Sequence, residues 1–176
     1  MQKAFNQDIS RWNTSHVIDM YGMFDNASSF NQPIGKWNTS KVREMSYMFF
    51  HAKSFNQNIN DWNVSHVEEM YYMFSHADSF NQPINKWNVS NVVFMEGMFK
   101  DAKSFSQDIS KWTPYYGLNY KDMGYEPKKT PIKEDKLSSI KFKFNNPKAK
   151  LFKEINDKLK KQQKMSNLNI KNNLEK

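Results

Sequence analysis

The sequence predicts an α/β repeat protein, a leucine-rich-repeat-like solenoid whose stacked strand-helix coils form a parallel sheet on one face. Three observations support this prediction. A 25-residue unit recurs at least four times in the 176-residue chain without an insertion, which is the signature of a stacked array. The second half of each unit has the apolar spacing of a helix. The first half has the spacing of a leucine-rich-repeat strand segment.

Six apolar residue types recur at fixed places in the units, as Trp37, Trp62 and Trp87 illustrate. In a stack of coils, equivalent residues lie about one strand spacing, ~4.8 Å, from each other. Each column therefore forms a continuous row, and we expect these rows to build the core. The predicted core residues are Phe30, Ile34, Trp37, Val42, Met45, Phe49, Ala52, Phe55, Ile59, Trp62, Val67, Met70, Phe74, Ala77, Phe80, Ile84, Trp87, Val92, Met95, Phe99 and Ala102.

The second half of each unit is predicted to be a short helix. Val42, Met45, Phe49 and Ala52 stand at i, i+3, i+7 and i+10 and would share one helix face. Ser40 precedes this segment in the position of an N-cap. Asp19, Glu44 and Glu69 fall in the first turn of the predicted helices, where the helix dipole favours carboxylates.

The first half of each unit is predicted to hold a short strand. Ile34, Trp37 and Thr39 have strand-segment spacing, and later units carry valine in place of the threonine. Asn31 and the glutamine and proline that follow it are predicted to form a turn, because asparagine and proline favour turns.

The repeat and the composition divide the chain into four parts. Residues 1–112 hold four full repeats and a partial fifth, and residues 113–127 read as a degenerate terminal coil. Residues 128–138 read as a polar linker, and residues 139–176 as a basic strand-helix tail that frays at its end.

Charge divides the chain in the same way. Residues 1–112 carry 10 basic and 11 acidic side chains, whereas residues 113–176 carry 16 basic and 7 acidic ones. The repeat body is therefore nearly neutral and the tail is basic. The tail helix, with Leu151, Ile155 and Leu159 on one face, could cap the last coil, lie on an anionic membrane surface or bind a partner. Nucleic acid is disfavoured because few aromatic residues interleave the lysines.

Two absences limit the classes of protein to which the sequence can belong. The chain has no cysteine, which excludes disulfides and thiolate metal sites. Its first residues contain neither the apolar segment of a signal peptide nor a lipobox, and no apolar run is long enough to span a membrane. If Met1 is the true start, the expected location is cytoplasmic.

The pattern F-N-Q-x-I-x-x-W-N-[TV]-S-x-V-x-x-M-x-x-M-F-x-x-A-x-S-F runs through residues 5–112. It resembles the BspA-like leucine-rich-repeat surface proteins, especially the mycoplasma lipoproteins with 25-residue repeats. The resemblance implies a non-catalytic protein at the cell surface or outside the cell. It also implies adhesion to a protein or host-surface ligand. The missing signal sequence and the start inside a repeat depart from the family, and a fragment of a longer surface lipoprotein is one alternative.

Two sets of columns are candidates for binding. The asparagine column that includes Asn38 should face outward, either as an amide ladder along the stack, which we favour, or as a binding face. The charged column beside it varies from coil to coil, as recognition surfaces do, although a solvated surface is an equal alternative. The predicted ligand face consists of Arg11, Asn13, Lys36, Asn38, Asp61, Asn63, Lys86, Asn88 and Lys111.

The column of His51, His76 and Asp101 has residue types that ligate zinc. Exposed residues at a helix end are the favoured interpretation, so no metal and no cofactor are predicted. No phosphate-binding loop, nucleophile elbow or zincin motif occurs in the sequence. The chain is therefore predicted not to be an enzyme.

Three functional hypotheses follow. The first is an interaction module, because aromatic residues fall at predicted exposed positions of the second half-unit. The second is a structural or antigenic spacer without a specific ligand. The third is a protein that reaches anionic surfaces with its basic tail. The uncapped first coil also predicts self-association. The aromatic residues of the first hypothesis are Tyr21, Tyr47, Phe50, Tyr71, Tyr72 and Phe94.

Overall fold

The computed structural model describes residues 4–115 and 123–125. The chain divides into two compact units, Met1–Thr130 and Pro131–Lys176. All described residues belong to the first unit. The predicted linker at 128–138 and the predicted strand-helix tail at 139–176 lie outside the described residues.

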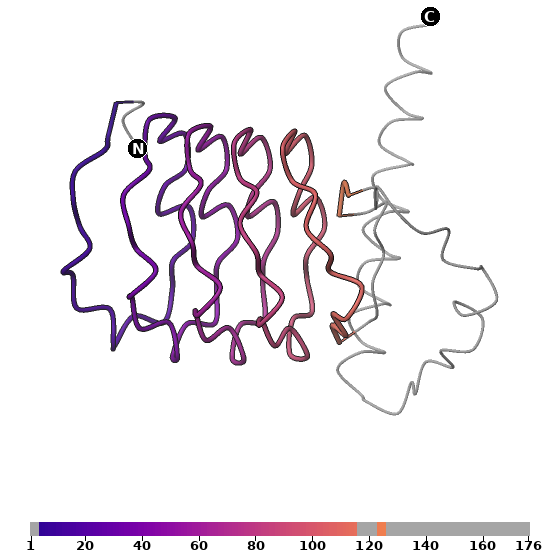
Figure 1. The fold of residues 1–176 in the computed structure, drawn as a ribbon. Helices are drawn as coiled ribbons and strands as arrows, with labels where there is room; N and C mark the ends of the chain where they lie inside the picture. Colours follow the sequence, from indigo (N-terminus) through magenta and orange to yellow (C-terminus); the bar gives the residue numbers. More distant parts are fainter. Residues whose placement is uncertain (1–3, 116–122, 126–176) are drawn as a thin grey trace, which may run out of the picture. The chain divides into compact units, whose positions relative to one another are not determined.

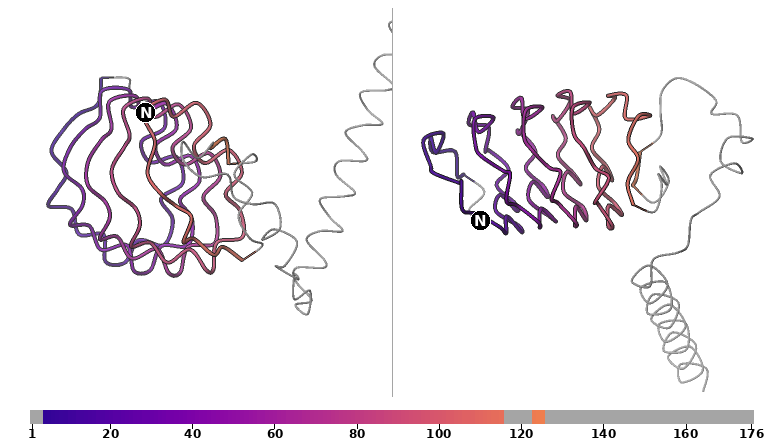
Figure 2. Two further views of the ribbon diagram at one scale, coloured as in Figure 1. Left: turned by 45° about the vertical axis from the view of Figure 1, so that its right-hand side comes forward. Right: turned by 90° about the horizontal axis from the view of Figure 1, so that it is seen from below.

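Each 25-residue unit forms one coil, and successive coils lie on one another in register (Figures 1 and 2). The register is visible in three parallel bridges that join one residue of each coil to the equivalent residue of the next. These bridges are Asp19 to Glu44, Glu44 to Glu69, and Glu69 to Phe94.

The prediction of strand-helix coils is wrong. Within residues 4–115 and 123–125 there is no helix, and the only extended pairing is that of the isolated bridges. In the segment predicted to be helical, Tyr47 and His51 have φ values of 58° and 56°. A right-handed helix requires negative φ at every residue. The equivalent residues of the other coils share this backbone conformation: Gly22, Asn26, Tyr72, His76, Gly97 and Asp101.

Consecutive tight turns take the place of the helix. The N–H groups of Met48, Phe50 and Ala52 donate to carbonyls three residues earlier, at 3.2, 3.1 and 3.0 Å. The N–H groups between them point along the stack and donate to carbonyls of the next coil. These donors and acceptors are Met45 to Glu69, Tyr47 to Tyr71, Phe49 to Met73, and His51 to Ser75, at 2.7–3.0 Å. Peptide planes therefore alternate between closing a turn and joining two coils.

The first half of each unit, predicted to hold a strand, contains no strand in the described residues. In this half, side chains join one coil to the next. The Oδ1 atom of Asn31 accepts the N–H of Asn56 at 2.9 Å, and the side chain of Gln57 donates to the same oxygen at 3.0 Å. The ladder continues through Asn6, Asn31, Asn56 and Asn81. The sequence predicts a turn at Asn31 and favours a ladder of hydrogen-bonded amides at the column of Asn38. The structure instead places the ladder at Asn31.

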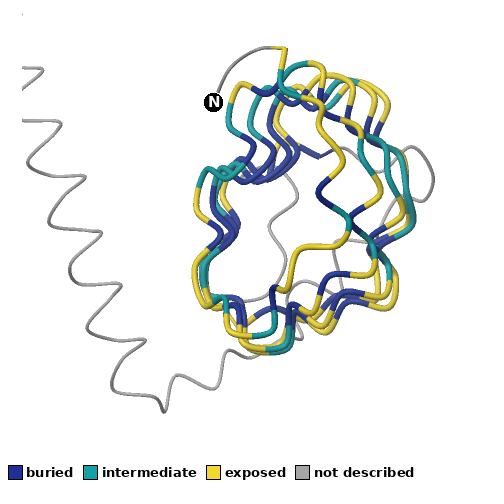
Figure 3. Cartoon of the chain, turned by 90° about the vertical axis from the view of Figure 1, so that its left-hand side faces the viewer, coloured by how far each residue is buried: buried dark blue, intermediate teal, exposed yellow. Residues whose placement is uncertain are grey.

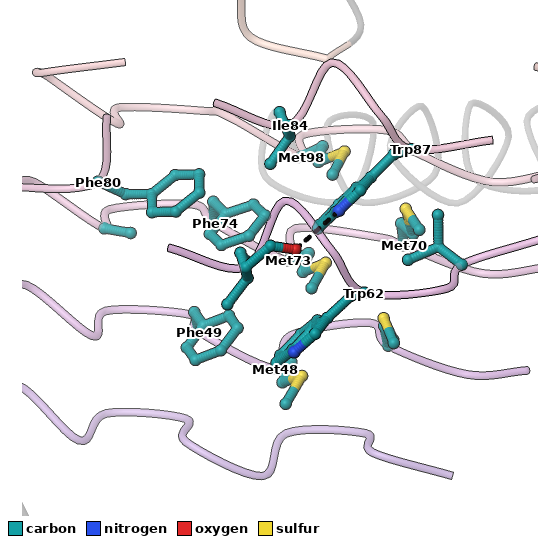
Figure 4. Close-up of a cluster of buried hydrophobic side chains, with 14 of the residues drawn as sticks. Met48, Phe49, Trp62, Met70, Met73, Phe74, Phe80, Ile84, Trp87 and Met98 are labelled. Carbon is teal, nitrogen blue, oxygen red and sulfur yellow. Dashed lines mark hydrogen bonds between the residues drawn. The ribbon is translucent and has the colours of Figure 1, made fainter. Parts of the chain in front are cut away.

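The core is a set of stacked rows of side chains (Figure 4). Trp37 and Trp62 lie parallel at a ring-centroid distance of 6.5 Å and an interplanar angle of 1°. The Trp62 indole N–H donates to the carbonyl of Ile34 at 3.1 Å. Equivalent bonds join Trp37 to Ile9, Trp87 to Ile59 and Trp112 to Ile84. Every predicted core residue is buried except Ala102, which is partly buried and packs against the core.

Residues 123–125 cover part of the last full coil. The N–H of Phe99 donates to the carbonyl of Met123 at 2.8 Å, just as Phe74 donates to Met98 at 2.9 Å. The Tyr125 hydroxyl donates to the Gln107 carbonyl at 2.8 Å. Met123 therefore occupies the same place on the last coil as Met98 occupies on the coil before it.

Replacing Trp62 by phenylalanine should lower the free energy of unfolding by about 1–3 kcal/mol, because the buried Ile34 carbonyl loses its donor. Trp12→Phe is the matched control, since the Trp12 indole meets no acceptor in the described chain and is 53% exposed. Urea unfolding measures both variants. A Trp62→Phe loss within about 0.5 kcal/mol of the Trp12→Phe loss would contradict the structural role of this bond.

Candidate binding surface

The predicted ligand face, here called the lysine–asparagine face, is exposed at all nine of its residues. Its asparagines bond within their own coils: the Oδ1 atoms of Asn38 and Asn63 each accept the N–H of the serine two residues later, at 3.0 Å. Across coils, the Lys86 ammonium pairs with the Asp61 carboxylate at 2.7 Å. Much of the polar capacity of this face is therefore used by the protein itself.

The exposed aromatic residues form a second surface on the turn-rich half of the coils. Tyr21, Tyr47 and Tyr72 make a row, the tyrosine ladder, with ring-centroid distances of 5.6 and 5.4 Å between neighbours. Tyr21 is 61% exposed, and the other two rings are half-buried. Phe50 packs edge-on against Tyr47 at 5.5 Å. Contacts between the rings, one stacked and two tilted or edge-on, hold these side chains in defined positions at the surface.

The tyrosine ladder ends on a glycine that makes room for it. Gly97 has φ of 64°, and a Cβ atom added there would lie 2.3 Å from Cε1 of Tyr72. The ring of Tyr72 therefore lies directly over the Gly97 backbone. A side chain at this position would have to displace the ring of Tyr72 from the place it occupies.

Carboxylates run beside the tyrosine ladder. Burial and the negative charge of Glu44 raise the pKa of Glu69, and the two carboxyl groups also share a hydrogen bond. Burial, followed by the charges of Glu69 and Glu96, raises the pKa of Tyr71 to about 12. Carboxylates of successive coils therefore lie close to one another and to the Tyr71 hydroxyl on this side of the stack. Together the residues make the tyrosine–carboxylate flank: Tyr21, Tyr47, Tyr72, Tyr71, Phe94, Asp19, Glu44, Glu69 and Glu96.

All six aromatic residues that the sequence placed at the surface lie on this side, and five of them are half-buried. Tyr71 stacks on Phe94 at 5.0 Å. Sequence reasoning found these aromatic residues but did not find the carboxylates beside them. The 25-residue spacing of Glu44 and Glu69 could have shown that the two acids lie side by side. The sequence analysis explains them instead as first-turn residues of a helix.

The column of His51, His76 and Asp101 lies at the end of the turns. The two imidazole rings stack at 4.3 Å with an interplanar angle of 9°, and His76 Nε2 is 3.6 Å from Asp101 Oδ2. Within the residues that the structure describes, no three histidine, cysteine or acidic side chains group closely enough to hold a metal ion. The zinc interpretation of this column therefore has no support there.

Comparison with known proteins places the chain in a family. Residues 1–78 and 34–139 match the family model described as "Mycoplasma protein of unknown function, DUF285". The chain belongs to this DUF285 family. The family is a mycoplasma-associated repeat family, which agrees with the mycoplasma resemblance of the sequence at that coarser level. No curated protein and no solved structure was found to match the chain.

The part of the DUF285 chain that is described contains no helix with the length and apolar character needed to cross a bilayer.

Acid should weaken the DUF285 coil stack through His51. Burial, and then the charge of His76, lowers the pKa of His51 below its ordinary 6.5. The folded state therefore binds this proton less readily than the unfolded chain does. The resulting stability is complete above pH 6.5 and is lost as the pH falls below it. Asparagine occupies the same column at Asn26 with φ of 58°, so His51→Asn fits the backbone.

The measurement is the melting temperature of both proteins at about pH 7.5 and about pH 5.5, on either side of the ordinary histidine pKa. His51→Asn should lose less stability on acidification than the parent protein. Equal losses in the two proteins would show that this imidazole does not contribute.

Glu69→Gln should act in the opposite direction. Because the folded state raises the pKa of Glu69 above its ordinary 4.5, the carboxyl group favours folding when protonated, and this contribution is lost as the pH rises through the raised pKa. Glutamine stays neutral. The variant should therefore melt at a higher temperature than the parent at neutral pH, with the gap closing near pH 4.5. A gap that does not change with pH would contradict this origin.

Proposed function

We propose that this DUF285 chain is a non-catalytic interaction module that acts at the cell surface in adhesion and binds a protein or host-surface ligand. The tyrosine–carboxylate flank is the proposed contact surface. The single observation that supports this most strongly is the tyrosine ladder, whose neighbouring rings lie 5.6 and 5.4 Å apart while all three tyrosines stay at least partly exposed. Surface aromatic residues often mark interfaces.

Preorganisation favours the tyrosine–carboxylate flank over the lysine–asparagine face. A tyrosine ring offers a large contact area and loses little freedom on binding. Here neighbouring rings already restrict it, because Tyr47 touches Tyr21, Tyr72 and Phe50. The lysines of the other face would lose side-chain entropy on binding. The asparagines of that face already bond to their own backbone.

A structural spacer is the second candidate. The ladder through Asn6, Asn31, Asn56 and Asn81 uses its polar groups to join coils, and it repeats almost unchanged. A spacer, whose only role is to extend the chain, would need such repeated bonds between coils. The two functions differ in one respect that can be tested: only the interaction module depends on the residues exposed on its flank.

The test uses the full chain against immobilised fibronectin, laminin and collagen and against cultured host epithelial cells. We expect measurable binding by the parent chain and at least about tenfold weaker binding by the double variant Tyr47→Asn, Tyr72→Asn, because aromatic anchors dominate interface energetics. Asparagine tolerates the positive φ at both positions.

The matched control is Lys36→Ser with Lys111→Ser on the lysine–asparagine face, which should bind like the parent. Circular dichroism and melting temperature establish that all variants fold. Loss of binding in the lysine variant alone would move the contact surface to that face. No binding by the parent to any of the probes would favour the spacer.

A further inference from the structure

Lysine and arginine side chains pair with acidic side chains of the neighbouring coil at equivalent positions. Seen along the stack, such positions lie one behind another, with the exposed side chains on the outside of the coils (Figure 3). Opposite charges at these positions are therefore close enough to neutralise each other. The pairs are Arg43 with Glu68, Lys86 with Asp61, and Lys103 with Asp78, at 2.7, 2.7 and 3.1 Å.

The column of Asp19, Glu44 and Glu69 has like charges instead. These residues form the parallel bridges between coils, so their side chains start from directly opposite backbone positions. Like charges placed opposite each other are destabilising. Among the described residues, no lysine, arginine or histidine makes an ion pair with these three carboxylates or with Glu96. Cations of the described coils therefore do not offset this column as they offset Asp61 and Asp78.

Aromatic rings of the tyrosine–carboxylate flank lie beside these acids. Burial raises the pKa of Tyr47, and the charges of the neighbouring tyrosines and of Glu96 raise it further. Glu44, Glu69 and Glu96 act on Tyr71 in the same direction, after burial. The rings of Tyr47 and Tyr72 lie 5.4 Å apart, and both residues are partly exposed. A ligand on the tyrosine ladder therefore meets aromatic rings and carboxylates together.

The side chain that suits such a surface is arginine. Its guanidinium group is planar and always charged, stacks on aromatic rings, and donates two parallel hydrogen bonds to one carboxylate. A lysine ammonium is a compact, strongly hydrated point charge and lacks this planar geometry. An arginine can thus contact a tyrosine ring and a glutamate through one group, whereas lysine offers mainly its charge.

We propose that the tyrosine–carboxylate flank binds an arginine-rich segment of another protein. Guanidinium groups of that segment pair with the carboxylates of Glu44 and Glu69 and stack on the rings of Tyr47 and Tyr72. The partner supplies the cations that the described coils do not place in this column. This partner chemistry rests on the proposed function, in which the flank is the contact surface.

The arginine content of the chain separates this partner from a second copy of the protein. The 176 residues contain only two arginines, Arg11 and Arg43. Arg43 already pairs with Glu68, and Arg11 belongs to the lysine–asparagine face. The basic residues within 113–176 are all lysines. An arginine-rich segment must therefore come from a different polypeptide.

Fluorescence anisotropy of labelled peptides added to the full chain tests the partner chemistry. The probe peptide alternates arginine with glycine, and matched peptides carry lysine or citrulline, the uncharged analogue of arginine, at every arginine position. Because the formal net charge of the chain is +8, its overall charge repels the basic peptides, and binding reports a local site. We expect saturable binding of the arginine peptide, at least about tenfold weaker binding of the citrulline peptide, and intermediate binding of the lysine peptide.

The double variant Glu44→Gln, Glu69→Gln tests where the peptide binds. Glutamine removes both charges but keeps an oxygen that can accept the Ser46 N–H, as Glu44 does. Binding of the arginine peptide should weaken at least about tenfold. The control variant Asp61→Asn, Asp78→Asn changes the formal charge equally, at carboxylates that lysines already pair, and should bind like the parent. Circular dichroism and melting temperature establish that both variants fold.

Several results would overturn this partner chemistry. The parent chain might be indifferent to the arginine peptide, or bind the lysine or citrulline peptide equally well. Equal weakening by the two double variants would show that overall charge, and not the flank, attracts the peptide. Light scattering provides the last check: self-association of the chain alone that Glu44→Gln, Glu69→Gln abolishes would assign the flank to a second copy.

Failure here is distinguishable from failure of the proposed function. If Tyr47→Asn, Tyr72→Asn loses binding to the matrix proteins or host cells while the parent does not bind the arginine peptide, the flank is a contact surface for a partner of different chemistry. If the parent binds the arginine peptide at the flank but none of the matrix proteins or cells, the arginine specificity stands and the proposed adhesion fails.

Discussion

The alternation of peptide planes is the constraint on which the rest of the structure depends. In the segment around Tyr47 every second N–H leaves its own coil and bonds to the next, and the N–H groups between them close turns three residues long. This arrangement requires positive φ at two places in each coil, which is why Tyr47 and His51 adopt it against their steric preference. The cost recurs in every unit and is offset by hydrogen bonds that form only when coils stack.

The other side of each coil uses side chains for the same purpose. Asn31 and its equivalents join coils through their amide oxygens, and each tryptophan indole donates to an isoleucine carbonyl in the coil before it. The indole N–H groups and isoleucine carbonyls of the core are thereby paired, although the structure has no regular strands there to pair them. The tryptophans and the asparagines equivalent to Asn31, which repeat with little change, thus join one coil to another. The positions that vary from coil to coil include the tyrosine–carboxylate flank, which is the contact surface that we propose.

The sequence showed which residues lie at the surface, but it did not show that carboxylates lie beside the aromatic residues. The aromatic residues around Tyr47 do lie on one side of the stack, and the lysine–asparagine face is exposed as expected. The carboxylates beside the aromatic residues were missed because Glu44 and Glu69 were assigned to a helix end, where acids have a structural explanation. Their mutual repulsion and burial appear only when coils are placed in register. Likewise, the stacking of His51 on His76 could be recognised only once the coils were placed in register, because the residue types alone do not show it.

The sequence by itself determined the 25-residue period, the stacking of units in register and the identity of the buried columns. Those features follow from the periodic hydrophobicity, which can be read directly from each 25-residue stretch of the sequence. Only the tertiary structure decided the backbone conformation. The spacing of Val42, Met45, Phe49 and Ala52 suits a helix and a run of tight turns equally well. Bonds to a coil 24 residues away favour the turns. For the same reason the amide ladder formed at Asn31 rather than Asn38: both are asparagines, and only their partners in the neighbouring coil distinguish them.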